Sequence, residues 1–242
     1  MDVLKICLIS VLIIVCVCVV YHYLFKNKSQ NNGVNAKDNG GWTKMHTAAS
    51  NGKPDDIKLL KEQGADINAR NNAGITPLHS ATFTGNIETM KLLIELGADV
   101  NAKNNDGVTP IHRASYDGNL EAIKLLISQG AEINIKSDEG MTPIHEAAIN
   151  GNLEAMKLLK ELGADVNMMC GEGITPLHCA LYKDQFDAMK LLKELGADLN
   201  AKVDGVTILD LARIRLSEAP ASHRRAQVVE WLQENGAVSG KQ

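Results

Sequence analysis

The sequence predicts an all-α solenoid of stacked helix-turn-helix repeats, each joined to the next by a hairpin loop, with one transmembrane helix in front of the stack. Three observations support this prediction: a short string that returns at a fixed interval, start and stop signals for two helices within each interval, and one long apolar run near the N-terminus. Self-similarity at a fixed period of this length marks stacked repeats, in which each unit buries its apolar face against its neighbours.

The returning string is Thr-Pro, then Ile or Leu, then His. Its four clear copies begin 33 residues apart, at Thr76, Thr109, Thr142 and Thr175. Two altered copies flank them: Thr43 is followed by Lys in place of Pro, and the string at Thr207, 32 residues after Thr175, has Asp in place of His. The sequence therefore predicts six repeats, near residues 38–70, 71–103, 104–136, 137–169, 170–202 and 203–238.

The third repeat shows the local signals. Its Asn-Asp-Gly at 105–107 has the composition of a tight turn. Thr109 suits the N-cap of a first helix, Pro110 its first position, and Gly118 the left-handed position that ends it. A second helix ends at Gly130 and has an apolar stripe at near-helical spacing, made by Leu120, Ile123, Leu125 and Leu126.

These repeats resemble ankyrin repeats. The resemblance rests on the T-P-L-H-x-A string, the Gly after the first helix, the Leu-Leu pair and the Gly-Ala-Asp-Val-Asn ending at 97–101 and 163–167, and it spans roughly residues 34–238. It implies a unit of hairpin, helix and helix, and a stack without a deep pocket. It also implies a concave face, formed by the hairpin tips and the outward side of the first helices, that binds a protein partner.

Composition and motifs argue against several function classes. The 242 residues have a net charge of −4 and a pI of about 6.0, so no overall basic field would draw the chain onto nucleic acid. The sequence lacks a nucleophile elbow, a P-loop, a zinc-protease helix and a Gly-rich phosphate loop after a strand. We therefore expect a non-catalytic protein with no cofactor, no nucleic-acid partner and no small-molecule substrate.

The apolar run from Ile6 to Phe25 is long enough to cross a bilayer once as a helix. A secretory signal is the competing interpretation, because Lys5 precedes the run, but no small-residue cleavage site follows it. Lys26 and Lys28 come after the run and place the repeats in the cytoplasm by the positive-inside rule. The predicted segments are a flank at 1–5, a transmembrane helix at 6–25, a flexible linker at 26–33, the repeat domain at 34–238 and a tail at 239–242.

The last repeat departs from the pattern, as a terminal repeat with a polar outer face should. Its extra residues lie around 217–224, where we expect them to lengthen the link between its two helices. Its arginines fit a solvated cap better than a nucleic-acid patch; they are Arg213, Arg215, Arg224 and Arg225.

Two groups of side chains could suggest metal chemistry. The His of each string recurs at one repeat position, and the resemblance implies that each bonds within its own turn, to the Thr three residues earlier. Cys170, His178 and Cys179 form the one cluster with metal-type ligands, but a zinc site requires closely spaced Cys pairs and four ligands. A structural role is therefore the preferred interpretation of both groups, and a metal site the alternative.

The expected partner-binding residues lie at two repeat positions. Seven residues after the Thr of each string stand Phe83, Tyr116, Ile149 and Tyr182, which the resemblance places on the concave side as an exposed apolar ladder. Trp42 extends this surface toward the first loop. The competing interpretation is that each ring lies flat against its neighbouring repeat.

A second ladder follows the fingertips, the tips of the hairpin loops, and contains Lys37, Arg70, Lys103, Lys136 and Lys202, with Met169 interrupting it. These residues are either solvated turn residues or a surface that steers an acidic partner, and Met169 suits an adaptable contact. The sequence thus predicts a membrane-anchored scaffold that binds a protein partner on its concave face. The alternative is a secreted or soluble effector whose N-terminal run is a signal sequence.

Overall fold

A computed structural model of the chain describes residues 33–171, 173–218 and 222–240. The predicted transmembrane helix at 6–25, and the predicted linker except for its last residue, lie outside these ranges. Within them, no helix combines the length and the apolar character that crossing a bilayer requires.

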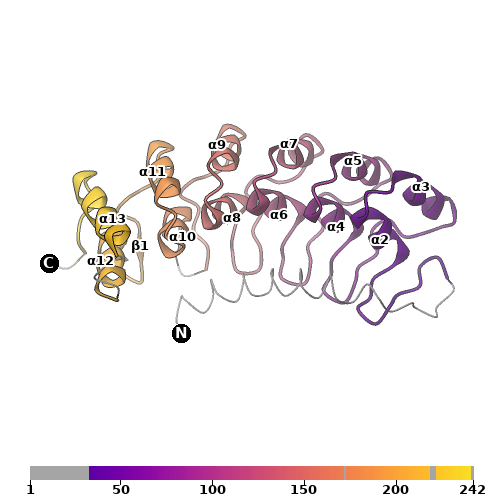
Figure 1. Cartoon of the computed structure of the whole chain (residues 1–242), viewed down its shortest axis with the longest axis horizontal. Helices are drawn as coiled ribbons and strands as arrows, with labels where there is room; N and C mark the ends of the chain where they lie inside the picture. Colours follow the sequence, from indigo (N-terminus) through magenta and orange to yellow (C-terminus); the bar gives the residue numbers. More distant parts are fainter. Residues whose placement is uncertain (1–32, 172, 219–221, 241–242) are drawn as a thin grey trace.

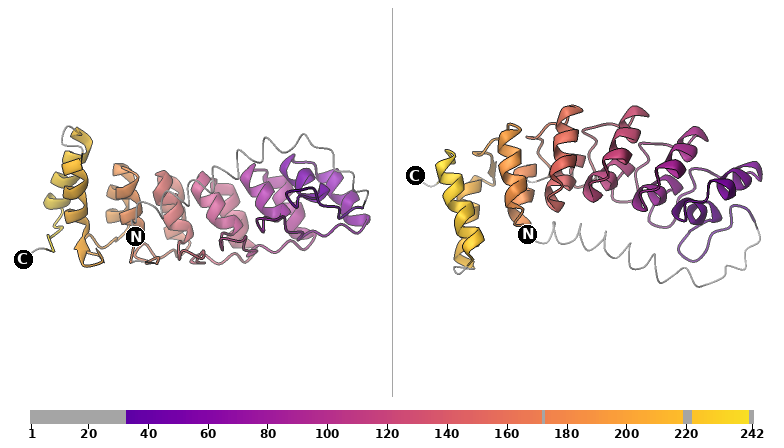
Figure 2. Two further views of the ribbon diagram at one scale, coloured as in Figure 1. Left: turned by 90° about the horizontal axis from the view of Figure 1, so that it is seen from below. Right: turned by 45° about the horizontal axis from the view of Figure 1, so that its top comes forward.

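Pairs of helices stack side by side along the long axis of the molecule (Figure 1). The pairs are α2 (Lys44–Ser50) with α3 (Pro54–Glu62), α4 (Pro77–Phe83) with α5 (Ile87–Glu95), α6 (Pro110–Asp117) with α7 (Leu120–Ser128), α8 (Pro143–Asn150) with α9 (Leu153–Glu161), and α10 (Pro176–Tyr182) with α11 (Phe186–Glu194). The first helices form one row and the second helices another, and hairpin loops project from the first row, as the further views in Figure 2 also show. The described chain is thus the predicted all-α solenoid, and its first helices and loops lie on the inner side of a gentle curve.

A capping box fixes where each first helix begins. In α6 the hydroxyl of Thr109 lies 2.9 Å from Nδ1 of His112, and the same ring nitrogen accepts a hydrogen bond from the Thr109 backbone N–H at 3.2 Å. Pro110 occupies the first position, where its missing N–H costs nothing. The same box opens α2, α4, α8 and α10, which confirms the predicted N-caps.

One continuous apolar core runs between the two rows of helices. The first helices that begin with proline, α4 to α10, contribute a fully buried residue directly after it, as Leu78, Ile111 and Ile144 show. The second helices face these with pairs such as Ile123 and Leu126. Since burying one such side chain stabilises the fold by about 1.5–3 kcal/mol, the stack depends mainly on this core.

Asparagines at the end of each repeat join neighbouring loops. Asn68 donates a hydrogen bond from Nδ2 to the carbonyl of Gly97 at 3.0 Å and accepts one from the Asp99 backbone N–H at 2.9 Å. The same paired bonds recur at Asn35, Asn101, Asn134 and Asn167. These bonds hold successive repeats in register.

The final unit differs from the others. Its loop is a two-stranded hairpin of β1 (Lys202–Val203) and β2 (Val206–Thr207), followed by α12 (Ile208–Glu218) and α13 (His223–Glu234). Most of its extra residues lie in the helices: α12 and α13 have 11 and 12 residues, whereas the first helices of the other pairs have 7 or 8 and the second helices 9. The insertion therefore extends the helices themselves.

Asp210 replaces the usual His in this unit. Its carboxylate accepts hydrogen bonds from the Thr207 hydroxyl at 2.9 Å, the Ser239 hydroxyl at 2.6 Å and the Gly240 backbone N–H at 2.8 Å. All three donors belong to the final unit and the residues directly after it. Asp210 therefore ties the last helix pair to its own C-terminal segment.

We predict that Gly118→Val destabilises the chain by about 1–3 kcal/mol. Gly118 ends α6 with φ of 69°, a left-handed conformation that strains other residues, and a Cβ there would lie 2.9 Å from Cγ of Asn152. Gly130→Val is the control, because φ is 91° there and a Cβ would meet no atom within 4 Å. Urea unfolding of both variants measures the effect. If both variants lose the same unfolding free energy, the contact with Asn152 contributes nothing. An unchanged urea midpoint for Gly118→Val would contradict the prediction.

Candidate functional site

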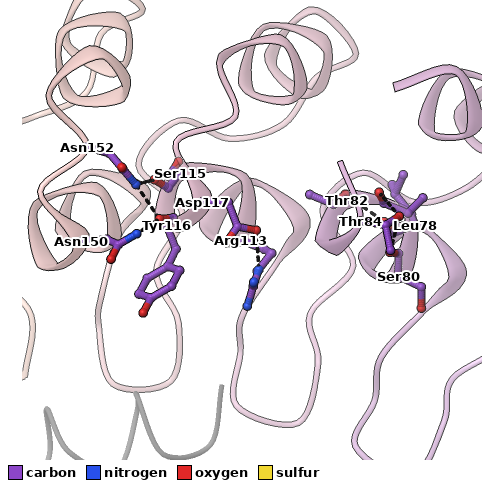
Figure 3. Close-up of polar contacts among 11 residues, drawn as sticks. Leu78, Ser80, Thr82, Thr84, Arg113, Ser115, Tyr116, Asp117, Asn150 and Asn152 are labelled. Atoms are coloured by element: carbon purple, nitrogen blue, oxygen red, sulfur yellow. Dashed lines mark hydrogen bonds and ion pairs between the residues drawn. The ribbon is translucent and has the colours of Figure 1, made fainter. Parts of the chain in front are cut away.

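The inner face of the stack contains two side chains from each first helix, four and seven residues after the Thr of its string. In α6 these are Arg113 and Tyr116. Both side chains leave the helix on the same side, toward the hairpin loops (Figure 3). We call this surface the inner face and define it by Phe83, Arg113, Tyr116, Glu146, Ile149 and Tyr182.

Arg113 is the centre of the inner face. Its guanidinium carbon lies 4.2 Å from the ring centroid of Phe83 and 5.6 Å from that of Tyr116. Its Nε donates to Oδ2 of Asp117 at 2.6 Å, and the side chains of Arg113 and Asp117 are 19% and 28% exposed. Burial raises the pKa of Asp117, and Arg113 opposes that rise. The sequence analysis missed Arg113, although its repeat position, three residues before the aromatic ladder, was the available signal.

The ladder of exposed apolar side chains was predicted wrongly at Ile149. This side chain is only 4% exposed and packs in a small cluster. The cluster consists of Met141, Ile149, Cys170, Ile174, Cys179 and Val203, with Tyr116 against it. Ile149 shares this cluster with Cys170, whose loop position holds a polar residue in the earlier loops: Asp38, Asn71, Asn104 and Ser137. Phe83, Tyr116 and Tyr182 are half-buried.

The aromatic residues at the two ends of the stack have partners. Trp42 meets the ring of His46 edge-on, with the centroids 5.3 Å apart. Tyr182 has the guanidinium carbon of Arg215 5.8 Å from its ring centroid. Contacts with its own repeat position Trp42, and contacts with the next repeat position Tyr182.

The cations of the fingertips bind the next loop. Lys37 donates to the carbonyl of Arg70 at 2.8 Å, and Arg70 donates in turn to the carbonyl of Lys103. The series continues from Lys103 to Lys136 at 2.9 Å and from Lys136 to Met169 at 3.0 Å. Met169, which is 50% exposed, cannot continue it. These cations therefore link neighbouring repeats, and their contribution to partner binding stays a prediction.

Four imidazoles of the recurring string, from His46 to His145, each join two repeats. The predicted bond between Thr and His within one turn is confirmed, but the sequence analysis missed a second bond from Nε2 to a carbonyl 29 residues later. These distances are 2.9 Å for His46 to Ile75, 3.1 Å for His79 to Val108, 3.0 Å for His112 to Met141 and 3.2 Å for His145 to Ile174. A carbonyl can only accept, so Nε2 carries the proton and Nδ1 accepts from the Thr. Burial lowers the pKa of His79, His112 and His145 to about 4, which keeps this neutral form at pH 7.

His178 lacks this second bond. Its Nε2 is buried and has no hydrogen-bond partner in the described part of the chain. The next Thr follows after 32 residues instead of 33, and the carbonyl expected here belongs to the β1–β2 hairpin. The junction between α10–α11 and the final unit therefore has neither the imidazole bridge nor the fingertip bridge.

An ion-pair cluster replaces these bridges at the last junction. Oδ2 of Asp184 accepts from Nη2 of Arg215 at 3.0 Å and from Nη2 of Arg225 at 3.4 Å. The prediction of a solvated cap was therefore wrong for Arg215 and Arg225, because both reach back to the preceding repeat. Arg213 remains near the surface, 3.7 Å from Asp210.

Cys170, His178 and Cys179 do not show the arrangement of a metal centre. Both thiols are buried in the cluster around Ile149. Across the described residues, no group of three or more His, Cys, Asp or Glu side chains is placed to hold a metal ion. Nδ1 of His178 lies 2.8 Å from the Thr175 hydroxyl, the same capping contact as in the other repeats.

Glu146 is the second inner-face residue that the sequence analysis missed. It follows the His of its string, at the position that Arg113 occupies one repeat earlier, and it is 5% exposed. Burial raises the pKa of this carboxyl to about 7, with the charge of Glu139 adding to the rise and Arg113 opposing it. A buried carboxyl with a shifted pKa is a frequent mark of a functional position.

Comparisons with known proteins agree with this geometry. A family model described as ankyrin repeats (three copies) matches residues 45–137 and 111–203. The two matches together cover well over half of the chain. A search of curated proteins found no match.

We predict that His112→Asn destabilises the chain by roughly 1 kcal/mol more than His178→Asn does. Both substitutions alter a capping box, but only His112 also loses a bond to the next repeat. Thermal and urea unfolding of the two variants provide the comparison. If both variants lose the same unfolding free energy, the bond from the imidazole to the next repeat does not stabilise the chain.

Proposed function

Because the chain belongs to the ankyrin repeat family, whose members are typically non-catalytic interaction modules, we propose that it is a membrane-anchored scaffold that holds a protein partner on its inner face. The proposal counts α2–α3 and α12–α13 as altered ankyrin repeats, which gives six in all. Ankyrin stacks bind unrelated proteins with one scaffold, so the surface residues and not the fold determine the partner.

The observation that supports this site is the group of Phe83, Arg113 and Tyr116. Two rings and a guanidinium share one patch on the inner side, and Arg113 lies close to both rings. Tyr and Arg dominate the binding energy of many protein interfaces when they are held in place and desolvated on binding. Here the contacts with Asp117 and between the repeats hold them before any partner arrives, which lowers the entropy lost on binding.

Tyr182, Trp42 and Met169 extend the proposed surface toward the two ends of the stack. The fingertip cations, Arg70, Lys103 and Lys136, contribute at its edge, since their head groups already bind carbonyls of the next loop. Ile149 is left out because it is buried.

The membrane anchor in this proposal is the apolar run at 6–25. Its length and its lack of charged residues support a single span. The lysines that follow it support a cytoplasmic repeat domain. The proposed localisation is therefore a single-pass membrane protein with the repeats on the cytoplasmic side.

We predict that the triple variant Phe83→Ala, Tyr116→Ala, Tyr182→Ala loses its protein partner or binds it at least about tenfold more weakly. Affinity capture from a lysate of the native cell, with the full chain in mild detergent, measures this. The control is Leu59→Ala with Leu162→Ala, which truncates apolar side chains that are 53% and 37% exposed away from the inner face.

Circular dichroism must show equal folding of both variants. A partner retained by the triple variant and lost from the control would move the binding site off the inner face.

We predict that the chain stays in membranes after alkaline extraction and that Ile13→Arg with Ile14→Arg releases it. Each Arg at the centre of a span costs about 2.5–3.5 kcal/mol of insertion free energy. Ser29→Arg in the predicted linker is the control and should leave the chain in the membrane. Recovery of the wild-type chain in the soluble fraction, with its N-terminus removed, would contradict the anchor and favour the secreted alternative.

A further inference from the structure

The final helix pair, at the end of the stack in Figure 1, is held together by bonds of its own. Arg225 of α13 donates from Nη1 to the carbonyl of Arg215 in the last turns of α12, at 2.8 Å. Asp210 of α12 accepts hydrogen bonds from Ser239 and Gly240, which follow α13. These bonds connect α12, α13 and the C-terminal segment, so the three form one unit that can move as a body.

The junction between this unit and α10–α11 lacks two bonds that every earlier junction has. Nε2 of His178 is buried without a hydrogen-bond partner among the described residues, and the fingertip series ends at Met169. Measured between Cα atoms, α12 and α13 also approach α10 and α11 less closely than any earlier helix pair approaches its neighbour. A small cavity lies at this junction, with Met189 of α11 among its lining residues on one side and Arg215 and Val228 on the other.

Other contacts cross this junction at exposed positions. Lys193 donates to the side-chain oxygen of Asn235 at 2.6 Å, and Asn200 accepts from the Val238 backbone N–H at 2.9 Å. Bonds that solvent reaches stabilise a fold less than shielded ones do. The part-buried polar contacts of this junction are therefore the ones that matter most for keeping it closed.

Those contacts belong to Asp184, which occupies a position where the earlier repeats have glycine. Asp184 follows α10 with φ of 53°, the left-handed conformation in which the earlier glycines end their helices. A residue with a Cβ is strained there, although Asp tolerates this conformation better than most. Strain of this kind persists where a contact compensates for it. The glycines at this position are Gly52, Gly85, Gly118 and Gly151.

The carboxylate of Asp184 makes the compensating contact. Its Oδ2 accepts from Nη2 of Arg215 at 3.0 Å and from Nη2 of Arg225 at 3.4 Å. The side chains of the two arginines are 11% and 24% exposed, whereas that of Asp184 is 43% exposed, so solvent and salt reach the pair from the side of the carboxylate. Nε of Arg215 is buried and has no partner within the described ranges. We call Asp184, Arg215 and Arg225 the ionic latch.

We propose that α12–α13 is a hinged unit that opens from the stack while α2–α11 stay folded, and that the ionic latch holds it closed. This inference goes beyond partner binding and does not depend on it. The chain between α11 and α12, which contains the β1–β2 hairpin, is the hinge. Opening separates Asp184 from both arginines and exposes apolar side chains such as Met189 and Val228, so the closed form dominates. The charged latch makes the opening sensitive to salt.

Hydrogen–deuterium exchange of the full chain in a neutral detergent, read by mass spectrometry of peptic fragments, measures the opening. In the wild-type chain, the amides of α12 and α13 should exchange at least about tenfold faster than those of α2 and α3. The α2–α3 pair is the matched reference, because it is the other end of the described stack and keeps both bridges, from His46 and Lys37. Equal exchange at the two ends would indicate ordinary fraying and would overturn the inference.

Asp184→Asn removes the charge and keeps a side chain that tolerates the left-handed conformation. This variant should speed the exchange of α12 and α13 together by about fivefold or more and leave α4–α9 unchanged. The control is Asp187→Asn, because Asp187 pairs with Lys190 inside α11 at 3.6 Å; it should change the exchange by less than about twofold. Equal exchange in the two variants would refute the latch, and a response of α13 without α12 would refute a unit that opens as one body.

Asp184→Gly separates the charge from the backbone strain. It restores the residue of the earlier repeats and relieves the left-handed conformation, yet α12 and α13 should exchange as fast as in Asp184→Asn. Exchange as slow as in the wild-type chain would refute the latch.

Salt gives an independent measurement on the same unit. Raising NaCl from about 50 mM to about 500 mM should speed the exchange of α12 and α13 about twofold or more in the wild-type chain and have no effect in Asp184→Asn. An equal response of both chains would show that the charge of Asp184 does not hold the unit closed.

Discussion

One side chain per repeat, the imidazole of the recurring string, couples the start of a helix to the stacking of the repeats. From His46 to His145, each imidazole closes the capping box of its own first helix through Nδ1 and binds the next repeat through Nε2. The neutral ring protonated at Nε2 is the one form that suits both bonds, because Nδ1 must accept and Nε2 must donate. Burial lowers the pKa far enough to keep that form, so the same desolvation that packs the core also sets the hydrogen bonding. Local helix formation and stacking are thereby joined in a single residue.

Local features of the fold were predictable from the sequence, and contacts between repeats were not. Thr109, Pro110 and Gly118 act within one helix, so their signals are complete in a short stretch of sequence. The bonds of His112 and Lys103 reach residues 29 and 33 positions away. Their geometry depends on how closely two repeats approach, which no single repeat encodes.

The candidate site shows the same division. Repeat position placed Phe83 and Tyr116 on one surface, where both rings lie near Arg113, because that position depends only on the period. It failed for Ile149, whose exposure depends on what the neighbouring loops place over it. It also passed over Arg113 and Glu146, since a charged residue next to the recurring string looks like an ordinary solvated residue until the burial of each is known. The surface available to a partner is therefore the part of each repeat that does not contact its neighbours.

The imidazole and fingertip bridges all run in one direction, from a side chain of an earlier repeat to a backbone carbonyl of a later one. A ribosome makes the earlier repeat first. Each newly made repeat therefore has donors whose acceptors have not yet been synthesised, and it becomes fully bonded only when its successor folds beside it. Asp210 ends this dependence, because its carboxylate is satisfied by donors of its own unit and of the residues directly after it. The replacement of His by Asp thus gives this unit a side chain whose hydrogen bonds do not need a later repeat.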